Sequence, residues 1–387
     1  MPRLPRLPSL TSLREYLSST LAFVALTAGL LVAAYWVLDP SPPRRVTLAT
    51  GVDQGAYAEF GRRYAALLKQ HGIEVVLRPT EGAAANLALL RDPDAGVDLA
   101  FVQGGADERS QPEAQQSDEG LVSLGSMFFE PVWLFYREDS AERLLKHKQL
   151  GTLAQLAGWK VNVGVPGSGV PPLMAQMLEA NRIEPGALSL SQLATTPAVV
   201  EFLEGRLDAL VMASAPESVM VQMLLQTPGI GLFDFAQAEA YSRRFPFMSP
   251  VTLPRGVVDL SADKPPQDVH LVAPTATLVA RESLHPALAQ LFVQAATQVH
   301  GDAGWFQRKG QFPNASNTER PLDPEAQRFY RNGVPWLQRY LPFWLSNLVD
   351  RMWVVLLSLV AVLLPLSRVL PPLVEMRIRS RVFRWYA

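Results

Sequence analysis

The sequence predicts an α/β fold built from two consecutive α/β units, with an apolar segment near each end of the chain. Short apolar runs typical of buried strands alternate with runs whose apolar residues recur at helical spacing, which favours largely parallel sheets covered by helices. A glycine-containing turn between a strand and a helix opens each unit, at residues 50–61 and 166–169. Two such turns facing each other across a cleft would hold one ligand between two lobes.

The composition narrows the class of protein. The 387 residues are 48% hydrophobic and 18% charged, which fits a folded protein that carries some membrane segment. A net charge of −1 and the absence of basic runs interleaved with aromatics argue against nucleic acid as a partner. Because the chain has no cysteine, disulfides, thiolate metal sites and thiol nucleophiles are excluded.

The first unit follows a βαβαβ pattern that begins with a short apolar strand. The predicted elements are strands over 46–49, 73–77 and 99–102 and helices over 58–71 and 83–90. Gly72 supplies a left-handed stop for the first helix. Residues 104–120 are rich in Gln, Asp, Glu, Ser and Pro and are expected to form an exposed loop, after which a strand over 132–136 crosses between the lobes.

The second unit repeats the device that opens the first. A basic helix near 144–148 precedes it, and Pro171 stands in the first turn of the helix that follows the second glycine turn. The predicted elements are strands over 161–165, 209–212 and 271–280 and helices ending at 181, 203, 226 and about 300. Residues 305–323 are expected to form a linker toward the membrane.

The first turn has the character of an anion site. Gly51 and Gly55 permit positive φ values and close backbone approach, and the first N–H groups of the next helix lack internal partners. Such donors, at the positive end of a helix dipole, suit a carboxylate or phosphate. The spacing of Gly51, Gly55 and Gly61 is not the dinucleotide fingerprint, and no P-loop sequence occurs, so nucleotide binding is disfavoured.

No catalytic or metal-binding constellation emerges from the remaining residues. Ser168 lacks the nucleophile-elbow pattern and a histidine base, so a hydroxyl contact to ligand is the better interpretation. The five histidines have no metal-type spacing, and Glu81, Asp98, Glu130 and Asp208 read as surface or structural carboxylates. We therefore expect no enzyme, no metal and no cofactor.

The N-terminal apolar segment, residues 17–38, is uncharged and about long enough to cross a bilayer core of roughly 30 Å. Arg3, Arg6 and Arg14 precede it, which favours a cytoplasmic N-terminus. A cleaved signal peptide is the alternative, with a tolerable cleavage site at Val32-Ala33-Ala34. The sequence favours an uncleaved signal anchor.

The C-terminal apolar segment, residues 347–367, reads as a second span. Asp350 and Arg351 at its start suit the headgroup zone, aromatic residues precede it, and a basic tail over 368–387 follows. Both termini then lie in the cytoplasm. A buried core helix at the end of a soluble domain is the alternative interpretation.

The glycine turns and the strands beside them resemble the TAXI-type solute-binding receptors of tripartite ATP-independent periplasmic (TRAP) transporters. The similarity extends from residue 46 to about 301. It rests on Thr50-Gly51, Gly55-Ala56-Tyr57 and Gly61, on Thr80-Glu81-Gly82-Ala83 with Asn86-Leu87, on residues 97–103, and on residues 164–169. The resemblance implies a two-lobed periplasmic-binding-protein fold, type II-like, that captures a small organic anion such as an amino acid or carboxylate.

The resemblance also implies which residues contact the ligand. They are Gly51, Gln54, Gly55, Tyr57, Gly82, Asn86, Gln103, Ser168 and Gly169. It implies a lobe I made of residues 44–135 and 268–310, a lobe II made of residues 136–267, and a juxtamembrane linker over 311–346. The partners would be TRAP permease subunits and the bilayer, with the main domain in the periplasm and the chain anchored in the bacterial inner membrane through residues 17–38 and 347–367, residues 1–16 remaining cytoplasmic.

The sequence departs from the family pattern at Ala83, at Val170 and at residues 52–54, which removes hydroxyls and adds a negative charge. The second apolar segment is a further departure. These differences keep an alternative open: a membrane-tethered periplasmic sensor or assembly factor whose cleft is degenerate.

Overall fold

The computed structural model describes most of the chain between the two apolar segments. The described residues are 24, 25, 27–30, 32, 33, 35, 36, 42–53, 55–107, 118–343, 345–350, 352–355, 357, 358, 360, 361 and 365. Residues 43–335 form one compact unit, and the two chain ends, 1–42 and 336–387, are grouped as another. Among the described residues there is no helix long and apolar enough to cross a membrane. The predicted spans, 17–38 and 347–367, fall only partly within the described residues.

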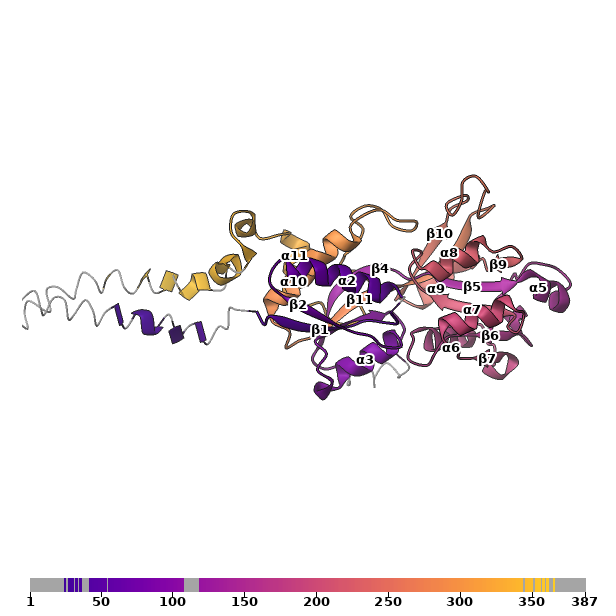
Figure 1. The fold of residues 1–387 in the computed structure, drawn as a ribbon, viewed down its shortest axis with the longest axis horizontal. Helices are drawn as coiled ribbons and strands as arrows, with labels where there is room; N and C mark the ends of the chain where they lie inside the picture. The colour runs from indigo at the N-terminus through magenta and orange to yellow at the C-terminus, as the bar shows by residue number, and fades with distance from the viewer. Residues whose placement is uncertain are drawn as a thin grey trace, which may run out of the picture. The chain divides into compact units, whose positions relative to one another are not determined.

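The first sheet of the compact unit has six strands and contains the start of the chain's α/β pattern (Figure 1). Strands β1 (Arg45–Ala49), β2 (Glu74–Arg78) and β3 (Leu99–Gln103) run parallel, as predicted. Antiparallel strands β4 (Leu121–Phe129), β11 (Val269–Arg281) and β10 (Met248–Leu253) complete it. Helices α2 (Ala56–Lys69) and α10 (Pro286–His300) lie together on one face, while α3 (Ala83–Arg91) packs on the other.

The second sheet has five strands in the order β7-β6-β8-β5-β9. Its strands are β5 (Val132–Arg137), β6 (Lys160–Asn162), β7 (Ser189–Ser191), β8 (Ala209–Ala213) and β9 (Ile230–Leu232). The surrounding helices are α5 (Glu138–Leu145), α6 (Val170–Ala180), α7 (Thr195–Leu203), α8 (Val219–Gln226) and α9 (Ala238–Arg244). Trp133 and Trp159 are among its fully buried side chains, so each sheet carries a core of its own.

Two connections join the sheets, which gives a two-lobed α/β architecture. The first lies between β4 and β5, at Glu130 and Pro131. The predicted crossing strand, 132–136, instead belongs wholly to the second sheet, because Val132 already pairs with Ala213. The second connection is β11, whose first residues pair with β10 and pack in the second lobe's core while its last residues pair with β3 and β4.

Strand β4 lies between the predicted loop, 104–120, and the next predicted strand, 132–136. The prediction of an exposed loop over 104–120 was wrong at its start, because Gly104, Gly105 and Ala106 are buried. β4 itself was not predicted. Its residues pair with β11, more than 140 positions later in the chain, and no short-range sequence pattern predicts a pairing over that distance.

The predicted linker, residues 305–323 and onward, is packed against lobe I. Ser126 and Asn314 exchange backbone hydrogen bonds of 2.8 and 3.1 Å, and Ser123 does the same with Pro321 and Asp323. Helix α11 (Pro324–Asn332) follows, and the Tyr330 hydroxyl donates to the Leu124 carbonyl at 2.7 Å. The linker prediction was therefore wrong for 311–335, because the outer edge of β4 needs partners for its backbone groups.

Candidate functional site

The first glycine turn joins β1 to α2. Gly55 caps α2 with φ −85° and donates from its N–H to the Val52 carbonyl at 2.8 Å. Neither Gly51 nor Gly55 has a positive φ, so the predicted dihedral requirement was wrong. Space is limited only at Gly55, where a Cβ would lie 3.1 Å from Val52 O; a Cβ on Gly51 would make an ordinary contact, 3.5 Å from the Tyr57 ring. Gln54 lies outside the described residues.

The turn before α3 is the position where only glycine fits. Gly82 has φ 144° and ψ −155°, a region that side chains avoid. A Cβ on Gly82 would lie 3.0 Å from the Cα of Ser168, which belongs to the second glycine turn. Gly82 is thus constrained by its own backbone and by the opposite lobe.

The start of α3 meets the second glycine turn directly. The Ala85 N–H donates to the Gly167 carbonyl at 3.0 Å, across the boundary between the lobes. A Cβ on Gly169 would lie 2.6 Å from Oε1 of Gln103 at the end of β3. The structure therefore brings Gly51, Tyr57, Gly82, Gln103, Ser168 and Gly169 to one junction between the lobes.

Two of the predicted ligand side chains make hydrogen bonds inside their own lobes. The Asn86 amide donates to the Phe101 carbonyl at 2.8 Å and accepts from the Thr80 hydroxyl at 2.7 Å, and the residue is fully enclosed. The Ser168 hydroxyl donates to the Val165 carbonyl at 2.8 Å. Both side chains hold the shape of their turns, and their contact with ligand stays a prediction.

Glu130 belongs to the junction, although the sequence analysis gave it only a surface or structural role. Its Oε2 accepts a 2.7 Å hydrogen bond from the Tyr57 hydroxyl, and the residue is only 3% exposed. Burial raises the pKa of the Glu130 carboxyl to about 8 and raises that of Tyr57 well above its usual value. The sequence did contain a signal for this burial: Glu130 is a single carboxylate between two apolar runs, 127–129 and 131–136. A carboxylate in that position is expected to be shielded from water.

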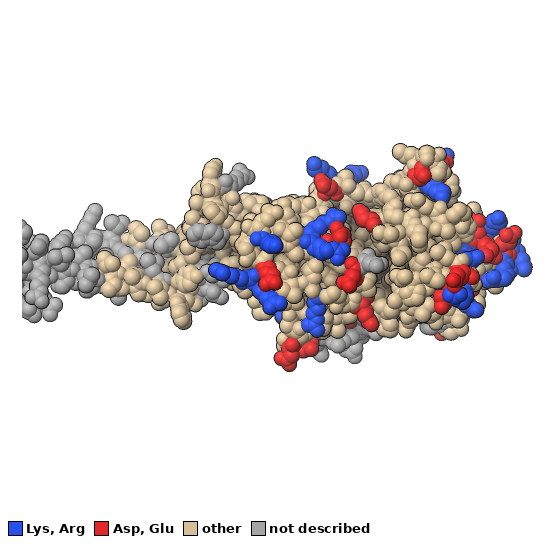
Figure 2. Space-filling view, viewed as in Figure 1, with Lys and Arg blue, Asp and Glu red and all other residues tan. Residues whose placement is uncertain are grey.

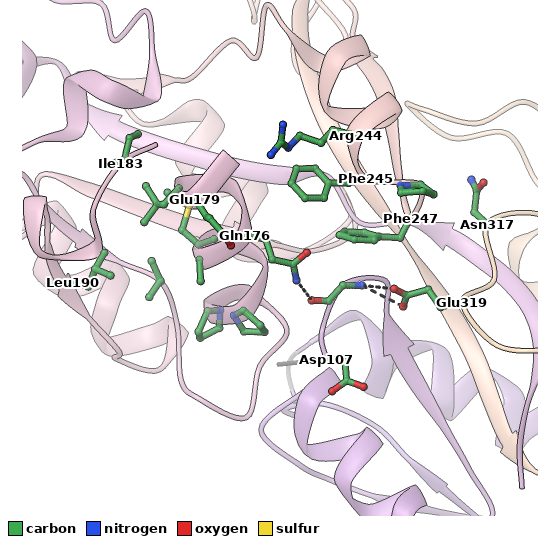
Figure 3. A pocket seen from close by; sticks show the side chains of 18 of the residues that line it. Asp107, Gln176, Glu179, Ile183, Leu190, Arg244, Phe245, Phe247, Asn317 and Glu319 are labelled. Atoms are coloured by element: carbon green, nitrogen blue, oxygen red, sulfur yellow. Dashed lines mark hydrogen bonds between the residues drawn. The ribbon is translucent and has the colours of Figure 1, made fainter. Parts of the chain in front are cut away.

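A cleft of about 1660 Å³ lies beside this junction, between α6 and the segments 244–247 and 315–320 (Figure 3). None of the predicted ligand residues lines it. Figure 3 shows Gln176 and Glu319 on opposite sides of the Gly105 peptide: the Gln176 amide donates to the Gly105 carbonyl at 3.2 Å, and the Gly105 N–H donates to Glu319 at 3.3 Å. Burial raises the pKa of the Glu319 carboxyl.

Charge is evenly spread around these features. On the face shown in Figure 2, acidic and basic side chains are interspersed and no extended patch of one sign forms. Arg91 pairs with Asp107 and Asp118, and Arg320 pairs with Asp118 at 2.7 Å, so the ions near the cleft are largely neutralised. In the described part of the chain, no group of three or more metal-ligating side chains gathers.

Comparison with known proteins places this two-lobed chain in a family. The NMT1-like family matches residues 48–332, which include both glycine turns and both sheets. The chain belongs to the NMT1-like family. No curated protein matches the sequence.

Several solved structures are similar to this NMT1-like chain over about two thirds of its length. The periplasmic aliphatic sulphonate binding protein SsuA from Escherichia coli is 16% identical, with 66% of this chain and 73% of that chain covered and a TM-score of 0.40. The CcmR regulatory domain from Synechocystis PCC6803, in complex with 2-PG, is 13% identical, covering 67% and 98%, with a TM-score of 0.41. A putative methionine-binding lipoprotein from Bacillus subtilis is 13% identical, covering 66% and 92%, with a TM-score of 0.37. These similarities are distant and carry no argument about the ligand of this chain.

Proposed function

We propose that this NMT1-like protein is a non-catalytic solute receptor that captures a small organic anion, an amino acid or carboxylate, between its two lobes. The observation that carries the proposal is the contact across the lobe boundary between the start of α3 and the second glycine turn, with Ala85 N–H bonded to Gly167 O at 3.0 Å. Backbone donors and glycines at such a junction offer an anion close approach from both lobes. The proposed contacts are Gly51, Gln54, Gly55, Tyr57, Gly82, Asn86, Gln103, Ser168 and Gly169.

Capture in this proposal is a change between open and closed lobes. Opening about β11 and the Glu130-Pro131 link would break the Ala85–Gly167 hydrogen bond and uncover Gly82 and Gly169. A neutral hydrogen bond contributes about 0.5–1.5 kcal/mol, so this contact alone holds the closed state weakly. A ligand that bonds to both turns would add to it and shift the population toward closure.

The finer assignment follows from the TAXI resemblance and the two apolar terminal segments. We propose that the receptor lies in the periplasm, is tethered to the bacterial inner membrane and delivers its ligand to TRAP permease subunits. A tether would keep the receptor at a high effective concentration beside its permease. Pull-down of the full-length protein from solubilised membranes with the product of an adjacent permease gene tests this part.

The experiment for ligand capture is a thermal-shift screen of the full-length protein against carboxylates and amino acids. We expect at least one compound to raise the melting temperature, and Gly82→Ala to abolish that shift, because its Cβ would lie 3.0 Å from Ser168 Cα. Gly186→Ala is the matched control, since a Cβ there meets nothing within 4 Å. A flat response of the wild type across the panel would contradict the proposal.

A second candidate function is a membrane-tethered sensor or assembly factor with a degenerate cleft. The observation favouring it is that the start of α3 bonds directly to the second glycine turn, while the Asn86 and Ser168 side chains bond within their own lobes. Small-angle scattering distinguishes the two functions. A sensor of this kind would be closed even without any added compound. A receptor would be open without ligand and would close when its ligand is added.

A further inference from the structure

Glu130 is a buried carboxyl at the point where the chain passes from lobe I to lobe II. Its N–H donates to the Pro274 carbonyl of β11 at 2.9 Å, which fixes the residue beside the strand shared by the lobes. One carboxyl oxygen, Oε2, accepts from Tyr57. Within the described residues no lysine, arginine or histidine forms an ion pair with Glu130, so a negative charge there would be uncompensated.

Strand geometry places Gln103 on the same face of the sheet as Glu130. Gln103 lies two residues beyond Phe101, and Glu130 lies two residues beyond Phe128, and alternate residues of a strand share a face. Phe101 stacks on the Tyr57 ring at 5.1 Å and lies 6.4 Å from the Phe128 ring, so this face is the one that α2 covers. Both polar side chains therefore stand at the edge of that face that meets lobe II.

Gln103 brings an unused donor to this edge. Its Oε1 lies against Gly169 of the second glycine turn, while its Nε2 is buried and has no hydrogen-bond partner. In the strand register Ala276 lies between Gln103 and Phe128, and its small side chain fills little of the space between these two residues. A buried amide without a partner is costly, so a ligand acceptor at this place would remove a penalty.

The groups that face Glu130 leave it without a positive neighbour. From α2 the facing group is the Tyr57 hydroxyl. The nearby titratable group of α10 is His300, which stacks on Phe128 at 5.3 Å and whose pKa burial lowers to about 3. β11 presents Pro274, Thr275 and Ala276, and the lobe II turn 166–170 is uncharged. The nearest charge on the turns is the exposed Glu81, which approaches Gly167 and has the same sign.

We propose that Glu130 acts in protonated form as a hydrogen-bond donor to the ligand, and that it and Gln103 Nε2 together bind one carboxylate of the anion. The proposal rests on the proposed receptor function and deepens it. Because Tyr57 donates to Oε2, the proton sits on Oε1 and is free to be donated to a ligand oxygen. Ionised Glu130 would repel the same anion, so capture is linked to the binding of a proton.

The linkage has a defined sign. The anion binds the protonated site, so affinity is constant at low pH and falls as Glu130 ionises near pH 8. Multiplying the affinity by the protonated fraction of Glu130 gives a loss of about tenfold between pH 7 and pH 9. Near the carboxyl's own pKa, about half a proton is taken up per ligand bound.

The test is titration calorimetry of the full-length protein with succinate and glutarate, and with aspartate and glutamate as their amino-bearing counterparts. Titrations in HEPES and in Tris at one pH give the number of protons taken up from the difference in ionisation heat of the two buffers. We expect carboxylate binding with proton uptake near pH 8 and the tenfold loss by pH 9. Glu130→Gln keeps a donor and should bind with no uptake and no loss up to pH 9, while the exposed control Glu74→Gln should behave as wild type.

The outcomes separate this inference from the receptor function. Carboxylate binding without pH dependence or proton uptake would overturn the role of Glu130 and leave the receptor intact. Binding of the amino acids alone, with proton release, would overturn it too, because Glu130 would then be the ionised partner of an ammonium group. No binding of any compound in the panel would overturn the receptor function as well. A melting temperature of Glu130→Gln at or above wild type shows that the variant is folded.

Discussion

Burial of Glu130 should make the protein less stable at alkaline pH, and Glu130→Gln should remove that effect. Burial in a site without a cation raises the pKa of this carboxyl from 4.5 to about 8. The folded state therefore binds this proton more tightly than the unfolded state. The contribution is fully present below pH 4.5, and it is lost as pH rises through the folded value near 8.

The magnitude follows from the linkage relation. A difference of about 3.5 pKa units corresponds to about 5 kcal/mol of unfolding free energy once both states are ionised. Between pH 6 and pH 9 the wild type should lose about 2–3 kcal/mol through this one group. Glutamine has nearly the same shape, accepts from Tyr57 and does not titrate, so the variant should lack this loss.

The assay is urea unfolding of full-length wild type, Glu130→Gln and the control Glu74→Gln at pH 6 and pH 9. Only the difference between variants is compared, so the contribution of other carboxyls whose pKa burial raises, such as Glu319, cancels. The reasoning is refuted if wild type and Glu130→Gln lose the same unfolding free energy between the two pH values. It is also refuted if Glu74→Gln shows the effect.

Two further predictions concern the packing around the junction. Gly105→Ala should destabilise the protein by more than Gly310→Ala. Both glycines have φ near 77°, but a Cβ on Gly105 would lie 2.5 Å from the Phe247 ring, whereas a Cβ on Gly310 would meet nothing within 4 Å. In urea unfolding we expect a loss of about 1 kcal/mol for Gly310→Ala and at least 2 kcal/mol more for Gly105→Ala, and equal losses would contradict the contact with Phe247. Tyr330→Phe should lower the unfolding free energy by about 1 kcal/mol, because it removes the bond to Leu124 O; an unchanged midpoint would show that residues 311–335 do not contribute to lobe I.

The sequence predicted the elements that rest on short-range signals. The parallel strands β1, β2 and β3 and the helices between them follow from apolar periodicity and from glycine and proline at the boundaries. Pro286 after His285 predicted the start of α10, and in the structure the His285 ring accepts from Ala287 N at 3.1 Å. Each of these signals is contained within one turn or one strand.

The features that sequence reasoning missed depend on partners far along the chain. β4 pairs with β11, and residues 314–323 satisfy the backbone of β4 from about 190 positions away. Six of the nine predicted site residues meet at one junction, but the reason given for Gly51 and Gly55 was wrong. Gly55 is constrained by the space that Val52 takes, a Cβ on Gly51 would make an ordinary contact, and of the three glycines before helices α2 and α3 only Gly82 has a positive φ.

The turns themselves show why a buried acid belongs in an anion site. Residues 50–58, 80–86 and 166–170 contain no lysine or arginine, and they include Asp53 and Glu81. An anion held there must be bound by neutral donors: the backbone N–H groups of the turns, the Gln103 amide and a protonated Glu130. Neutral donors give up less hydration than an ammonium or guanidinium, so an anion can bind and leave with modest affinity. Because Glu130 also forms the link between the lobes, its proton would be held or lost at the point about which the lobes open.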